Sequence, residues 1–223
     1  MRKRFDKELD ELLSELLFMA SLAEKAVETA ILALQNRDAA LAQKVIDEDV
    51  LIDQLEIKIE KICISLLTYH ETMAGSLRRV VSALKINNDL ERIGDHAVNI
   101  AENTLQLQRE PLFEPLRDIP LLAKLAQHMV RDAIDAFVHR DAATAIAVCR
   151  KDDEIDALNR QILRDFITHM ANAPGNTSRG LSLILVSKNL ERIADLSTNI
   201  AEEVVYMVEA RTIKHVGLDE RSA

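Results

Sequence analysis

The chain of 223 residues contains an internal duplication, and this feature restricts its fold more than any other. With a shift of 103 residues, the tetrapeptide Arg-Asp-Ala-Ala at 37–40 recurs at 140–143. Further along, with a shift of 100 residues, Leu-Glu-Arg-Ile-x-Asp at 90–95 recurs at 190–195. Self-similarity over such a distance indicates that one supersecondary unit occurs twice along the chain.

The hydrophobic pattern predicts three helices in each unit. Apolar residues recur at i, i+3, i+4 and i+7, which is typical of amphipathic helices, over residues 6–35, 39–70, 76–108, 118–138, 142–171 and 178–212. Asp38 and Asp141 each precede a helix that they can cap. Long helices with short connections form antiparallel bundles. We therefore expect an all-α fold of two tandem three-helix bundles, with the first unit at 1–110, a linker at 111–120, the second unit at 121–215 and a flexible tail at 216–223.

Composition excludes several classes of function. The net charge of -9 argues against a nucleic-acid partner. No apolar run approaches the ~18 residues that a membrane span needs, so we expect a cytoplasmic protein without membrane insertion. The two cysteines, Cys63 and Cys149, have no metal-ligand spacing and are expected to be buried free thiols.

Carboxylates at positions i and i+4 recur in both units. Two such residues lie only about 40° apart around a helix, so each pair faces one way. Like charges at this spacing destabilise a helix by a few tenths of a kcal/mol, which something should offset. The pairs are Asp49/Asp53, Glu91/Asp95, Asp152/Asp156 and Glu191/Asp195.

Antiparallel hairpins place these pairs opposite each other. Asp53 with Glu91, and Asp49 with Asp95, share a midpoint at residue 72, and the corresponding pairs of the second unit share a midpoint at 173.5. Each unit thus brings four carboxylates to the same height. Carboxylate oxygens suit hard cations, so the sequence predicts a site for iron, manganese, zinc or magnesium in each unit.

The acidic stripes are also compatible with roles that involve no metal. Arg92, Arg192 or Lys188 can form ion pairs with the carboxylates, or the stripes can simply be solvated, and His96 can serve as an accessory ligand if a metal binds. A di-iron oxidase needs Glu-x-x-His, and no histidine here has an acidic residue three positions before it. A different metal-dependent bundle enzyme or a metal-storage protein stays as the alternative. Spare apolar helix faces make a homodimer plausible.

The stretches 90–102 and 190–202, each containing Glu-Arg-Ile-(Gly/Ala)-Asp, closely resemble the motifs of the PhoU family, and the resemblance covers nearly the whole chain. It implies a non-enzymatic, six-helix protein whose metal clusters involve the eight carboxylates named above. It also implies a negative regulator that couples the ATPase of a phosphate-specific ABC transporter to a sensor histidine kinase. The sequence departs from the family at Leu196, where a histidine is common, and at 72–78.

Overall fold

The computed structural model describes residues 2–69, 74–108 and 118–214. Within these residues every regular element is a helix: α1 (Arg2–Asn36), α2 (Ala39–Glu48), α3 (Val50–Tyr69), α4 (Ala74–Leu107), α5 (Ile119–His139), α6 (Ala142–Asn172), a short 3-10 turn η1 (Pro174–Asn176) and α7 (Thr177–Glu209). The all-α prediction is confirmed. The expected turn at residue 72, most of the expected linker at 111–120 and the expected tail at 216–223 lie outside the described residues.

One predicted helix differs from the observed one. The expected helix at 39–70 is interrupted at Asp49, which separates α2 from α3. The carbonyl of Asp49 accepts backbone hydrogen bonds from Ile52 at 2.8 Å and from Asp53 at 3.2 Å. An i+3 hydrogen bond belongs to the tighter 3-10 geometry, so the helix tightens locally at Asp49, which is one of the predicted ligands. Its counterpart Asp152 lies within the uninterrupted α6.

The repeated Arg-Asp-Ala-Ala sequence forms the same corner in both units. Arg37 and Arg140 adopt left-handed backbone conformations, with φ of 52° and 53°. The next residue, Asp38 or Asp141, begins the following helix, and its Oδ1 accepts hydrogen bonds from the two N–H groups at the start of that helix. The predicted helix caps are therefore confirmed.

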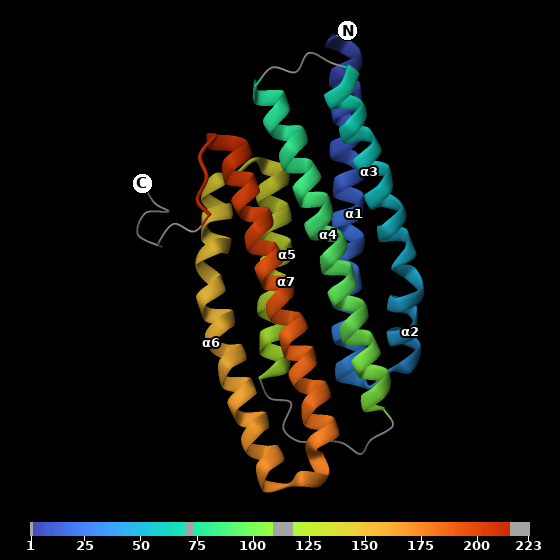
Figure 1. Ribbon diagram of the computed structural model, residues 1–223, viewed down its shortest axis with the longest axis vertical. Coiled ribbons are helices and arrows are strands. Elements are labelled where there is room, and N and C mark those ends of the chain that lie inside the picture. Colours follow the sequence, from blue (N-terminus) through green and yellow to red (C-terminus); the bar gives the residue numbers. More distant parts are fainter. Residues whose placement is uncertain (1, 70–73, 109–117, 215–223) are drawn as a thin grey trace.

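The two three-helix units pack along their length into one body. α4 of the first unit lies against α7 of the second, and α1 lies against α5 (Figure 1). A single cluster of buried apolar residues runs through both units. Cys63 and Cys149 are buried in it as free thiols, as the sequence predicts. The candidate carboxylates lie where α3 faces α4 and where α6 faces α7.

Candidate metal centre

The first acidic cluster lies between α3 and α4, and its carboxylates repel each other. Burial, followed by the negative charges of Asp53 and Asp95, raises the pKa of Asp49 from 3.8 to about 6. Burial, followed by the charges of four neighbours, raises the pKa of Glu91 from 4.5 to about 7, and these neighbours are Asp95, Glu56, Asp53 and Asp49. The structure therefore brings together the four carboxylates that the hairpin register predicts, with Glu56 as a fifth.

Gly94 allows the two helices to come this close. A Cβ at this position would lie 3.0 Å from Ile52 Cδ1 and 3.1 Å from Asp49 Oδ1. Both distances are shorter than ordinary van der Waals contact, so a side chain here would displace the ends of the Ile52 and Asp49 side chains. The glycine in the middle of the Glu-Arg-Ile-Gly-Asp motif thus leaves room for the Asp49 side chain against α4.

No basic side chain neutralises this first cluster. Among the described residues, no Lys, Arg or His nitrogen forms an ion pair with Asp49, Asp53, Glu91 or Asp95. Arg92 lowers the pKa of Asp89, whose net pKa is raised to about 6 because burial outweighs this effect. Ion pairing therefore does not account for the four carboxylates of the first unit.

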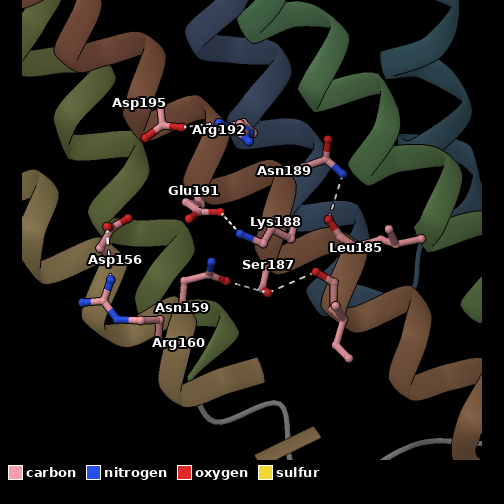
Figure 2. A network of polar contacts seen from close by, with 11 residues as sticks. Asp156, Asn159, Arg160, Leu185, Ser187, Lys188, Asn189, Glu191, Arg192 and Asp195 are labelled. Atoms are coloured by element: carbon pink, nitrogen blue, oxygen red, sulfur yellow. Dashed lines mark hydrogen bonds and ion pairs between the residues drawn. The ribbon is translucent and has the colours of Figure 1, made fainter. Parts of the chain in front are cut away.

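The second cluster, between α6 and α7, is neutralised by cations of its own (Figure 2). Three of its carboxylates form ion pairs: Lys188 with Glu191 at 2.5 Å, Arg192 with Asp195 at 2.9 Å and Arg160 with Asp156 at 3.2 Å. The fourth, Asp152, accepts a hydrogen bond from Thr198 at 3.5 Å. Arg192 and Lys188 thus form ion pairs with the carboxylates, as the sequence allows, and both pairs lie within α7 rather than across the hairpin.

The carboxylates of the second cluster nevertheless lie close enough to influence one another. Burial raises the pKa of Asp195, and the charges of Glu191 and Asp156 act in the same direction, although Arg192 opposes them. Close to this cluster, Ser187 Oγ donates to the buried Asn159 Oδ1 at 2.9 Å and so joins α7 to α6 (Figure 2). The hairpin register is therefore preserved in the second unit, while the charge balance is not.

Two pairs of corresponding positions explain the difference between the clusters. The repeat aligns Asn88 with Lys188, and Ile57 with Arg160. At both positions the first unit lacks the cation that the second unit has. The acidic residues alone could not reveal this, but comparing the flanking residues of the two repeats could have done so.

The geometry sets a limit on the metal prediction. Across 2–69, 74–108 and 118–214, no three His, Cys, Asp or Glu side chains converge closely enough to hold an ion. The donor chemistry of the first cluster suits a hard cation, because its carboxylates are close, half-buried or exposed, and have no basic partner. The eight carboxylates, Asp49, Asp53, Glu91, Asp95, Asp152, Asp156, Glu191 and Asp195, therefore stay predicted ligands.

Sequence reasoning missed a second polar site, at the junction of the two units. Glu203 of α7 is 2% exposed, and its Oε1 lies 3.0 Å from Lys85 Nζ of α4 and 3.0 Å from Lys214 Nζ, which follows α7. Ser82 Oγ of α4 donates to Glu203 Oε2 at 3.3 Å. The signal was available, because Glu203 interrupts the apolar stripe formed on α7 by Leu196, Ile200 and Met207.

His96 also joins the units. Its Nδ1 lies 2.8 Å from Asn189 Oδ1 of α7. This hydrogen bond gives His96 a structural partner in the other unit, so a role as accessory ligand stays untested. Among the described residues, no helix combines the length and the apolar character that crossing a bilayer requires.

Comparison with known proteins gives concordant results. The family model for the PhoU domain matches residues 16–104 and again 119–204. A phosphate-specific transport system accessory protein PhoU homolog from Pseudomonas putida is 39% identical, over 99% of this chain and 87% of its own length. The crystal structure of PhoU from Pseudomonas aeruginosa superposes with a TM-score of 0.91 at 37% identity, covering 93% of this chain and all of that one. The phosphate transport system regulatory protein PhoU from Streptococcus pneumoniae superposes with a TM-score of 0.88 at 32% identity, covering 94% of this chain and 99% of that one.

Proposed function

Because the chain belongs to the PhoU family of phosphate-transport accessory proteins, we propose that it represses phosphate uptake and phosphate-regulon signalling in the cytoplasm when phosphate is plentiful. In this proposal it couples the ATPase of a phosphate-specific ABC transporter to a sensor histidine kinase. The relatives are named as accessory and regulatory proteins, not as enzymes. This supports a role in binding partners and argues against the bundle enzyme or storage protein that the sequence left open.

We further propose that the first acidic cluster binds a metal ion and that this binding is part of the regulation. The observation that carries the proposal is the contrast between four carboxylates without a basic partner and a second cluster with three ion pairs. Asp49, Asp53, Glu91 and Asp95 would hold iron, manganese, zinc or magnesium. The ion would supply positive charge and cross-link α3 to α4. The α3–α4 hairpin would then present a fixed surface to a partner protein.

The second cluster would bind the same ion more weakly. Lys188, Arg160 and Arg192 already neutralise its carboxylates, and a cation must displace these partners before it can bind. We also propose that the protein works as a homodimer.

Elemental analysis combined with a repression assay tests these proposals. Tag-free protein is purified without chelator, back-titrated with iron, manganese, zinc or magnesium, and compared with Asp95→Asn, Asp195→Asn and the double variant. We expect Asp95→Asn to lose most of the bound metal and to derepress a phosphate-regulon reporter, and Asp195→Asn to lose less metal. Asp165→Asn, an exposed acid on α6 outside both clusters, is the matched control.

Two outcomes would contradict the proposals in separate ways. Metal content and repression that stay unchanged in the double variant would show that the carboxylates are not functional ligands. Loss of metal with full repression would leave the metal site in place and would refute its role in signalling.

A further inference from the structure

Two arginines from different units lie close together without an acidic partner. Arg79 lies in the second turn of α4, and Arg140 forms the corner between α5 and α6. Burial, followed by the positive charge of Arg140, lowers the pKa of Arg79, and no acidic residue of the described chain opposes this shift. Within 2–69, 74–108 and 118–214, neither guanidinium forms a hydrogen bond or an ion pair. Two positive charges therefore meet in a chain whose net charge is -9.

The repeat shows that the corresponding arginines have structural partners. With the shift of 103 residues, Arg140 corresponds to Arg37, whose guanidinium donates to two carbonyls at the C-terminal end of α4, at 2.8 Å and 3.2 Å. With the shift of 100 residues, Arg79 corresponds to Arg179, whose guanidinium donates to the side chain of Asn176. In each pair of corresponding arginines, one is held within its own unit and the other has no such contact among the described residues.

The two arginines without a partner meet at the junction of the units. α4 begins toward the end of the body at which α5 turns into α6 (Figure 1). Like charges repel each other, and the partial burial of Arg79 makes this repulsion more costly. Beside Arg79, the buried Nε of Arg78 finds no acceptor in the described part of the chain, although buried polar groups are normally hydrogen-bonded. This end of the junction therefore lacks both negative charge and hydrogen-bond acceptors.

We propose that Arg79 and Arg140 together bind a phosphate group, either as free phosphate or as the phosphate monoester of a small molecule. A guanidinium presents a planar fork of N–H donors that matches the oxygens of phosphate. The two guanidiniums carry two positive charges, and a phosphate monoester carries about −1.5 to −2 at pH 7. One phosphate group can therefore neutralise both arginines, whereas one carboxylate can neutralise only one of them.

Such a ligand would link the two units. It would connect α4 of the first unit to the α5–α6 corner of the second, and it would replace a repulsion by two attractions. Because Arg140 is exposed and solvent screens its charge, we expect weak binding, with a dissociation constant on the order of 1 mM. The site uses none of the eight predicted metal ligands, so the inference depends on neither the metal nor the signalling proposal.

Nuclear magnetic resonance of the arginine Nε–H groups tests the site. Protein kept free of metal by chelator is titrated with inorganic phosphate at constant ionic strength, and we expect the signals of Arg79 and Arg140 to shift until they saturate. Arg79→Gln and Arg140→Gln should each raise the dissociation constant about tenfold or more, because each removes a charged donor. Arg79→Lys keeps the charge without the fork and should weaken binding less than Arg79→Gln. Arg164→Gln, which removes an exposed guanidinium from α6, should leave binding unchanged.

Two further ligands identify the bound group. If glycerol phosphate binds more tightly than inorganic phosphate, the site takes a phosphorylated small molecule, and the opposite order assigns it to free phosphate. Acetate carries one charge and should bind about tenfold more weakly or worse. Acetate that binds as tightly as phosphate would overturn the assignment to a phosphate group.

Two other results would overturn the site itself. Shifts that grow linearly with phosphate concentration, without saturation, would show that the anion only screens the protein surface. Saturable binding that Arg79→Gln and Arg140→Gln leave unchanged would place the phosphate elsewhere. Circular dichroism of each variant checks that the fold is intact, so that a loss of binding can be assigned to the missing guanidinium.

Discussion

Substituting Glu91 should stabilise the protein in the absence of metal, which is unusual for a half-buried residue in a helix. Its carboxylate is surrounded by four others and has no basic partner among the described residues. Glu91→Gln keeps the size of the side chain and removes its charge. The matched variant Glu191→Gln removes the corresponding charge of the second unit, where Lys188 lies 2.5 Å from the carboxylate.

The raised pKa of Glu91 sets the magnitude and the sign of the expected change in the free energy of unfolding. The rise for Glu91 from 4.5 to about 7 corresponds to at most roughly 3 kcal/mol. Because the side chain is half exposed and solvent screens its interactions, we expect a stabilisation of about 1 kcal/mol. The folded chain holds this proton more tightly than the unfolded chain does. The contribution that protonated Glu91 makes to the stability of the folded state is therefore complete below about pH 4.5 and is lost as the pH rises through about 7.

Urea unfolding in the presence of chelator measures this effect. At about pH 8 we expect Glu91→Gln to unfold at higher urea than the wild type, and at about pH 4.5 the two should coincide. Glu191→Gln should lose a few tenths of a kcal/mol at the higher pH, because it gives up an i,i+3 ion pair. A destabilised Glu91→Gln at high pH, or equal effects of both variants, would refute the argument. Added metal should reverse the order, because only the wild type then gains stability.

Three further changes test the packing by urea unfolding. Gly94→Leu should cost about 1–3 kcal/mol, since a Cβ there already lies 3.0 Å from a side chain of α3, and a neutral result would disprove the close approach. Replacing Lys85 and Lys214 together by Met should lower the free energy of unfolding by about 3 kcal/mol, because the buried Glu203 then loses both of its cations. A loss of only a few tenths of a kcal/mol would show that water reaches Glu203. Arg140→Gly should stabilise by up to about 1 kcal/mol by relieving a left-handed backbone with φ of 53°, and a loss of stability would show that the arginine side chain outweighs this strain.

Much of the fold follows from local rules that the sequence states directly. The helix ranges follow from hydrophobic periodicity, and Asp38 and Asp141 mark two helix starts because an acceptor is needed there. Register also follows, because residues equidistant from the turn of an antiparallel hairpin stand at one height. The negative charge of Asp95 on α4 raises the pKa of Asp49, as expected if the two carboxylates stand at one height, and this bears out the register.

The docking of the two units could not be predicted in the same way. A repeat fixes each bundle, but the contact between α4 and α7 depends on surfaces from both units. Its polar contacts link residues far apart in sequence, such as His96 with Asn189 and Lys85 with Glu203. None of these pairs follows from spacing along one helix. The interruption at Asp49 was missed for a related reason, because it lies where α4 comes close at Gly94.

The duplication itself separates what the fold requires from what the function requires. Both units must bury an inner face, and both do. They differ where packing makes no demand: Ile57 stands where the second unit has Arg160, and Asn88 stands where it has Lys188. The exchange at Ile57 has two consequences. It deprives Asp53 of the i+4 partner that Asp156 has, and it leaves an apolar side chain exposed on the outer face of α3. The unneutralised acidic cluster between α3 and α4 costs stability, and neither this cluster nor the exposed apolar residues of α3 serve the packing of the bundle. Their occurrence together on α3 locates the specialised part of the molecule in the first unit.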